Sequence, residues 1–157
     1  MELHRKFELF ADYFQLLLID ASPESEAPTT WSKEAVAHML TFGRNSVSLG
    51  TLRNVIVPFE LHIHLSEPRF DPATFDHVVT GSLSVPSGEL VVMGCTDSFA
   101  DAARVKLTAG TYQFVYVVTG VDTITDESAL AHDKYALHCW SGPTRQPLTI
   151  KQWRPHV

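Results

Sequence analysis

The chain has 157 residues, enough for one domain that buries its own core. Hydrophobic residues make up 45% of it and charged residues 19%, a balance that excludes an intrinsically disordered protein. The formal net charge of −6 at pH 7 disfavours direct binding to nucleic acid, because phosphate contacts need clustered Lys and Arg.

The sequence predicts a cytoplasmic protein without a membrane anchor. Its N-terminus, MELHRKFELFADYFQ, mixes apolar and polar residues and lacks the uninterrupted apolar stretch of a signal peptide. The apolar run QLLLI is far shorter than the roughly 20 residues that a transmembrane helix needs. Cys95 and Cys139 lie in apolar surroundings far apart in the sequence, and we expect both to be free thiols.

Residues 7–19 predict the first strand, because apolar and polar side chains alternate at its start and aromatic residues are frequent. The next segment, DASPESEAPTT (residues 20–30), contains two prolines and three acids and has no periodicity. It predicts a solvated loop. Glu24 and Glu26 make this loop a candidate acidic surface for binding another protein.

A helix is expected over about residues 32–40, in WSKEAVAHML. Ser32 is a suitable N-cap, since its hydroxyl can accept a hydrogen bond from a backbone N–H of the first turn. Trp31 and Val36 have the spacing of a hydrophobic staple. Gly43 is expected to end the helix. The sequence therefore predicts one accessory helix that covers an end or a face of a sheet.

From residue 45 onward, apolar runs alternate with turn signals about every ten residues, which is typical of a β-sandwich or barrel. Strands are expected at residues 46–52, 54–65, 76–85, 89–96, 103–107, 111–120 and 134–140. Two hairpins are expected, with turns at residues 86–88 and 108–110, and Pro58 is expected to break or bulge its strand. These patterns predict an all-β, two-sheet antiparallel sandwich with one accessory helix. The single domain would span residues 1–157, with a C-terminal tail from about residue 141.

The segment LTAGTY (residues 107–112) resembles the tyrosine corner of β-sandwiches, in which a tyrosine hydroxyl binds the backbone a few residues upstream. Alanine replaces the usual proline here. We therefore expect Tyr112 to have a structural role, holding the chain where it crosses from one sheet to the other.

Cys95, Thr96 and Asp97 form the first candidate for chemistry, because a cysteine beside a carboxylate suggests a nucleophile. A reactive thiol needs a nearby cation or a helix N-terminus, however, and no histidine lies within fifteen residues of Cys95 in the sequence. The favoured interpretation is that Cys95 ends a buried strand.

His62 and His64 are the candidate metal ligands. Residues two apart on a strand share a face, so these two imidazoles are expected to project together. A zinc site would need a third ligand, for which the candidates are His77, His132, Asp133 and His138. The alternative without a metal, in which the two histidines form part of the polar face of a half-buried strand, is favoured.

Residues 120–133 form an acidic segment whose carboxylates, Asp122, Asp126, Glu127 and Asp133, do not have the spacing of a calcium-binding EF-hand loop. A solvated loop is expected, with an acidic protein-binding edge as the alternative. Trp140 follows at the end of the last expected strand, where a core position is favoured over an exposed stacking position.

Three segments taken in order, FELFADYFQLLLID, TWSKEAVAHML and NSVSLGTLRNVIVPFELHIHL, resemble the competence protein J (ComJ) family, and VKLTAGTYQF resembles its late L-x-x-G-x-Y-Q strand. The matching residues of the first three segments are Tyr13, Gln15, Trp31, Ser32, Glu34, Ala35, Arg53 and Asn54. The whole pattern is closer still to a group of uncharacterised bacterial proteins of similar size. The resemblance implies a small cytoplasmic, β-rich protein that binds and restrains another protein, as the competence protein restrains a partner nuclease. We expect it to be non-enzymatic and to need no cofactor.

The leading functional hypothesis is thus a protein-binding module of the inhibitor or immunity type. Its expected contact residues are Glu24, Glu26, Arg53, Asp122, Asp126, Glu127, Asp133 and Trp140. One alternative is a sandwich that binds a small ligand or carbohydrate through Trp140, Trp153 and Tyr135. The other is a metal-dependent enzyme that uses His62 and His64.

Overall fold

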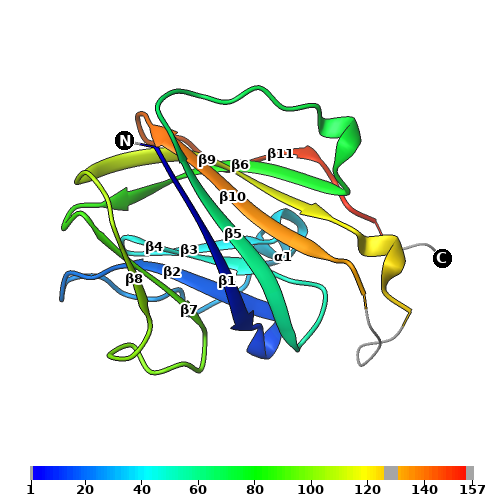
Figure 1. Ribbon diagram of the computed structural model, residues 1–157, viewed down its shortest axis with the longest axis horizontal. Helices are drawn as coiled ribbons and strands as arrows, with labels where there is room; N and C mark the ends of the chain where they lie inside the picture. The colour runs from blue at the N-terminus through cyan, green and yellow to red at the C-terminus, as the bar shows by residue number, and fades with distance from the viewer. Residues whose placement is uncertain (1, 126–130, 155–157) are drawn as a thin grey trace.

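Two β-sheets packed face to face form the protein in the computed structural model, which describes residues 2–125 and 131–154 (Figure 1). Within these residues the larger sheet has six strands, in the order β1 (Leu3–Phe10), β5 (Ile56–His64), β10 (Lys134–Ser141), β9 (Gly110–Thr119), β6 (His77–Val85) and β11 (Leu148–Lys151). The smaller sheet has five, in the order β3 (Leu40–Gly43), β4 (Ser46–Gly50), β2 (Gln15–Asp20), β7 (Glu89–Gly94) and β8 (Ala103–Lys106). The helical elements are α1 (Lys33–His38) and the 3-10 turns η1 (Asp12–Phe14), η2 (Pro72–Thr74) and η3 (Val121–Thr123).

The predicted sandwich with one accessory helix is confirmed. One strand pair departs from the antiparallel pattern: β5 and β10 run parallel, whereas the other described pairs are antiparallel. Side chains that alternate along each strand fill the space between the sheets. Phe59 and Leu61 of β5 and Phe114 and Tyr116 of β9 are completely buried there.

The predicted first strand, residues 7–19, is in fact two strands in different sheets. β1 is an edge strand of the larger sheet and β2 is the central strand of the smaller one. Between them the chain turns at η1, where Tyr13 and Phe14 adopt left-handed backbone angles (φ of 56° and 59°). Local hydrophobic alternation is similar on both sides of this turn, so it could not reveal the change of sheet.

Both predicted hairpins are wrong for the same reason. The turn at residues 86–88 joins β6 to β7, and the turn at 108–110 joins β8 to β9, but each pair is divided between the two sheets. Turn residues mark where the chain reverses, and they do not show which sheet receives the next strand. The tyrosine corner is confirmed, because the Tyr112 hydroxyl donates to the Thr108 carbonyl at 2.5 Å. This hydrogen bond holds the connection between β8 and β9, where the chain crosses from the smaller sheet to the larger one.

The accessory helix begins as predicted and ends earlier. Ser32 is its N-cap, with the hydroxyl accepting from the Ala35 N–H at 3.1 Å. Met39 then takes a left-handed conformation (φ of 62°) and ends the helix, and the chain continues at once as β3. Val36 is 61% exposed, so the expected staple with Trp31 does not bury it.

The remaining differences concern Pro58 and the C-terminal tail. Pro58 lies within β5 without ending it, one residue before the ladder with β10 begins at Phe59. The tail from about residue 141 contains β11, which pairs with β6 and extends the larger sheet. Among the described residues no helix is long and apolar enough to cross a membrane.

Candidate functional site

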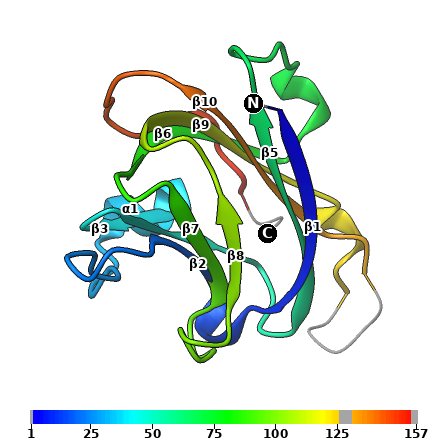
Figure 2. The same cartoon turned by 60° about the vertical axis from the view of Figure 1, so that its left-hand side comes forward.

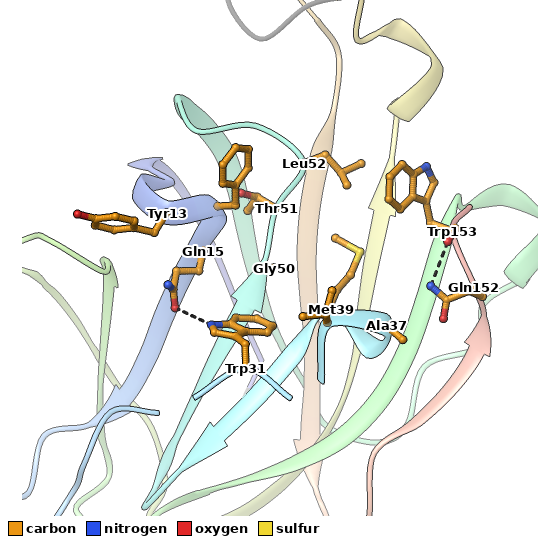
Figure 3. A pocket seen from close by; sticks show the side chains of 12 residues that line it. Tyr13, Gln15, Trp31, Ala37, Met39, Gly50, Thr51, Leu52, Gln152 and Trp153 are labelled. Atoms are coloured by element: carbon orange, nitrogen blue, oxygen red, sulfur yellow. Dashed lines mark hydrogen bonds between the residues drawn. The ribbon is translucent and has the colours of Figure 1, made fainter. Parts of the chain in front are cut away.

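A groove of about 640 Å³ opens at one end of the smaller sheet and is the candidate functional site. Four segments distant in sequence line it: η1 with the start of β2, α1 with its flanks, the end of β4 with the residues that follow, and the chain after β11. Figure 3 shows Trp31 and Trp153 on opposite sides of the groove, with Met39 between them. The lining residues are Tyr13, Phe14, Gln15, Trp31, Val36, Ala37, Met39, Gly50, Thr51, Leu52, Gln152 and Trp153.

Strained backbone is concentrated at this groove. Tyr13, Phe14 and Met39 are three of the four non-glycine residues with positive φ in the described part of the chain. Each such conformation costs about 1–3 kcal/mol and persists only where the surrounding structure holds it. Strained residues of this kind are common at functional sites. Both bends are fastened to the same strand end: the Gly50 N–H donates to Met39 O at 2.8 Å, and the Thr51 N–H donates to Phe14 O at 2.9 Å.

Two buried tyrosines hold that strand end from the core side. The Tyr116 hydroxyl donates to the Gly50 carbonyl at 2.6 Å. The Leu52 N–H donates to the Tyr135 hydroxyl at 3.1 Å. Burial raises the pKa of both phenols, so both remain protonated and able to donate. The wall at residues 50–52 is thus fixed before any ligand arrives.

The rim of the groove carries exposed apolar side chains. Tyr13 is 71% exposed, Val36 61% and Phe14 47%. Trp31 is only partly exposed, and its indole N–H donates to the Gln15 side chain at 3.4 Å (Figure 3). Exposed aromatic rings beside a concave apolar surface are typical of sites that bind another protein or an organic ligand.

Arg53 and Asp133, predicted as separate surface contacts, form one buried ion pair with each other. The Arg53 guanidinium donates from Nη2 to Asp133 Oδ1 at 2.7 Å and from Nε to Asp133 Oδ2 at 3.2 Å. Arg53 is 8% exposed and Asp133 1%. The Tyr135 hydroxyl completes the network by donating to Asp133 Oδ2 at 2.7 Å. The expectation that these two charges are exposed is corrected, because each satisfies the other in the interior.

Trp140 is also interior rather than an exposed anchor. It lies on the outer face of the larger sheet in a small cluster with Val115 and Val117 and is only 4% exposed. Phe70 and Phe75, from the segment between β5 and β6, pack on this cluster. Tyr135 is buried as well, so of the three aromatics proposed for ligand binding only Trp153 reaches the groove.

Of the predicted acidic contacts, those that the structure shows exposed lie at two ends of the molecule (Figures 1 and 2). Glu24 and Glu26 are exposed in the loop after β2, and Asp122 is exposed in η3. Figures 1 and 2 both show the loop after β2 and η3 at opposite ends. Asp126 and Glu127 lie outside the described residues.

The two candidate metal ligands do project together, from the outer face of β5, and the sheet adds two more imidazoles. His138 of β10 brings its Nδ1 to 2.9 Å from His64 Nε2. The His4 ring stacks on His62 with centroids 4.0 Å apart, and its Nε2 lies 2.6 Å from Glu60 Oε1. Burial and the neighbouring imidazoles lower the pKa of His62 and lower that of His138 to about 4.

Of the four candidate third ligands, His138 alone joins the metal-binding groups found in the described residues. His77 is buried, its Nε2–H donating to His38 O and its Nδ1 accepting from the Trp153 N–H, and Asp133 belongs to the ion pair. His4 was not predicted as part of this cluster, because a first strand that begins at Phe7 does not pair His4 with His62.

The surroundings of Cys95 are structural, as expected from its position at the end of a strand. Its thiol donates to the Asp12 carbonyl at 3.1 Å, and burial with the nearby Asp12 and Asp97 carboxylates raises the thiol pKa. The Asp97 carboxylate accepts from the Gly94 N–H at 2.7 Å and so closes the turn after β7. A thiol with a raised pKa is a poor nucleophile.

Comparison with known proteins places this fold. No family model and no curated protein sequence matches the chain. The crystal structure of ComJ from Bacillus subtilis, an inhibitor of the DNA degrading activity of NucA, is similar with a TM-score of 0.70 and 19% identity, covering 90% of this chain and 99% of that one. A protein described as crocagin biosynthetic gene J is similar with a TM-score of 0.63 and 18% identity, covering 91% and 99%. The resemblance predicted from the sequence is therefore confirmed at the level of architecture: the chain has the fold of ComJ.

Proposed function

We propose that this chain is a cytoplasmic, non-enzymatic protein-binding module that inhibits a nuclease. The observation that carries the proposal is the similarity to ComJ, which covers 90% of this chain and nearly all of that structure. ComJ is described as a nuclease inhibitor. At 19% identity the similarity supports a shared class of activity and leaves the particular nuclease to be identified by experiment.

The groove is the proposed contact surface. Three residues on which the sequence resemblance to the ComJ family rests, Tyr13, Gln15 and Trp31, line it. A fourth, Ser32, caps the helix at its side, and a fifth, Arg53, follows the groove wall directly. Aromatic rims of this kind supply the few residues that dominate binding energy in protein interfaces.

Position in the fold favours η3, rather than the loop after β2, as the acidic part of this surface. The Leu52 N–H of the groove wall is hydrogen-bonded to the Tyr135 hydroxyl, which is hydrogen-bonded to Asp133. Asp133 is the last residue of the acidic segment that contains Asp122. The loop after β2, which contains Glu24, lies at the opposite end of the sandwich from η3 (Figures 1 and 2). An exposed carboxylate such as Asp122 would attract the basic cleft of a DNA-degrading enzyme and speed association.

The test is capture followed by inhibition. The immobilised protein is exposed to lysate of its host, eluted in salt steps, and each eluate is assayed for DNA degradation with and without added free protein. Capture of a nuclease that is silenced on re-addition supports the proposal. If a different protein is captured, the chain remains a binding module and nuclease inhibition is refuted; capture of no protein refutes both.

Matched variants then locate the surface on the captured nuclease. Tyr13→Asn removes the ring while keeping a residue that tolerates the left-handed backbone, and we expect inhibition to weaken about tenfold or more. Asp122→Lys should slow association, whereas Glu24→Lys makes the same charge change at the far end and should not. If Glu24→Lys slows association and the other two variants inhibit normally, the groove assignment is wrong.

A second candidate function, binding of a small ligand or carbohydrate, is favoured by the groove itself. Its volume of about 640 Å³ is within the range of small-molecule sites, and Trp31 and Trp153 offer faces for stacking on a sugar. A panel of glycans and metabolites is screened by thermal unfolding, since a ligand of the native state raises its stability. A stabilising compound whose effect disappears in Trp31→Leu would favour this function; a panel without effect would refute it.

A further inference from the structure

We propose that His62, His64 and His138 form a binding site for a divalent transition-metal ion of the zinc class. One nitrogen from each imidazole lies within 4.8 Å of the other two. Zinc binds imidazole nitrogens at about 2.0–2.1 Å, so the nitrogens of a tetrahedral site lie about 3.3 Å apart. Small rotations of the three side chains would bring them to that spacing.

Strand register, rather than loop conformation, builds this cluster. His62 pairs directly with His138 across the parallel ladder of β5 and β10. His64 follows two residues later on the same face, and its Nε2 approaches His138 Nδ1 to 2.9 Å. The backbone positions of all three ligands are therefore set by the larger sheet, which is the kind of rigid support that a metal site requires.

An ordinary solvated face of a strand does not have this arrangement. All three imidazoles are partly buried, and the His62 and His138 rings stack with centroids 4.3 Å apart. Two imidazole nitrogens 2.9 Å apart can share only one hydrogen between them, whereas a metal ion can accept a lone pair from both. A cation satisfies the whole cluster at once.

Glu60 and His4 are suited to support the site from outside. Glu60 Oε1 lies 3.8 Å from His62 Nε2 and 2.6 Å from His4 Nε2. Histidine ligands of zinc commonly donate their second N–H to a carboxylate, which orients the ring. At 3.8 Å Glu60 is within ion-pair range of His62 but not hydrogen-bonded to it, so it would accept this N–H only after the His62 ring moves closer, while His4 holds Glu60 at 2.6 Å.

A cavity of about 350 Å³ adjoins the cluster. His64 and His138 line it together with Phe70, Phe75 and Val115, beneath the segment that joins β5 to β6. Three protein ligands with room for an added water or anion are typical of zinc sites that bind an exogenous molecule. The ion would thus have space for a fourth ligand.

The test uses the full chain without an affinity tag, stripped with EDTA, dialysed, and titrated with Zn²⁺ by calorimetry and with Co²⁺ by visible absorption. We expect one ion per chain and the intense visible bands of tetrahedral Co²⁺. His138→Gln and His64→Gln should each lose more affinity than the roughly 10- to 100-fold that follows removal of an outer partner. His4→Gln, which removes a neighbouring imidazole of the same row, should lose about tenfold or less.

Circular dichroism first establishes that each variant is folded. If His138→Gln does not fold, His64→Gln provides the decision, since binding that survives in it overturns the proposal. Failure of the unmodified protein to bind either ion overturns it as well. Loss of binding in His4→Gln with retention in His138→Gln also overturns it, because the ion would then occupy His4, Glu60 and His62 instead. None of these readouts depends on nuclease inhibition.

Discussion

Replacing Asp133 by Asn should destabilise the protein strongly, because it removes the carboxylate charge that pairs with the buried Arg53 guanidinium. Both side chains are interior, and two hydrogen bonds of 2.7 and 3.2 Å join them. The neutral amide can still accept from Tyr135, but its NH2 group then faces the Arg53 Nη2 donor that Asp133 Oδ1 accepted from, so a hydrogen bond is lost together with the charge. Breaking a buried ion pair from one side costs about 3–5 kcal/mol, whereas breaking an exposed pair costs about 0–1 kcal/mol.

The expected change in melting temperature follows from chain length. A protein of 157 residues loses about 2–4 °C per kcal/mol, so Asp133→Asn should melt about 6–20 °C lower. Thermal and urea unfolding monitored by circular dichroism at pH 7 measure both quantities. Arg53→Met and the double variant complete a thermodynamic cycle.

In that cycle the double variant should lose less stability than the two single variants together, by about 0.5–3 kcal/mol, because it removes both charges of the pair. The reasoning is refuted if Asp133→Asn loses less than about 1 kcal/mol, as an exposed pair would. Strict additivity of Arg53→Met and Asp133→Asn would refute it as well, since the two residues would then not stabilise each other.

Two further predictions concern the sheet crossing and pH. Tyr112→Phe removes the 2.5 Å hydrogen bond to Thr108 and should cost about 0.5–1.5 kcal/mol in urea unfolding, and an unchanged free energy would contradict the corner's role. Burial lowers the pKa of His77, so the unfolded state takes up the proton first, and stability should fall as pH drops below about 6.5. The loss should be smaller in His77→Gln, which keeps a donor and an acceptor but does not titrate; equal slopes in both proteins would show that His77 does not contribute.

Features set by neighbouring residues were predictable from the sequence. The Ser32 cap needs only a hydroxyl three residues before the N–H that it accepts from. The Tyr112 corner needs a turn and a tyrosine four residues after the carbonyl that it binds. The strand at 134–140 was placed within one residue of β10 (Lys134–Ser141), because aromatic and branched residues alternate along it. In each case the determining contact or pattern spans a few residues.

Features set by pairing between distant strands were not predictable. The alternation of residues 7–19 is compatible with one strand, and only packing against two different sheets divides it at η1. Arg53 and Asp133 are 80 residues apart, and nothing in the sequence distinguishes a charge that is buried in a pair from one that is exposed. Both residues were therefore expected at the surface, which is the usual place for either residue.

The burial of Arg53 changes how the family resemblance should be interpreted. Tyr13 and Trp31 are groove residues, but Arg53 is packed in the core behind the groove wall, where Leu52 is bonded to Tyr135. If the groove binds the partner, Arg53 acts indirectly, by fixing the shape of that wall. Variants of the rim should then weaken inhibition without changing stability, whereas Arg53→Met should change stability first and inhibition only as the wall loosens. Measuring both quantities on the same variants separates a contact residue from a supporting one.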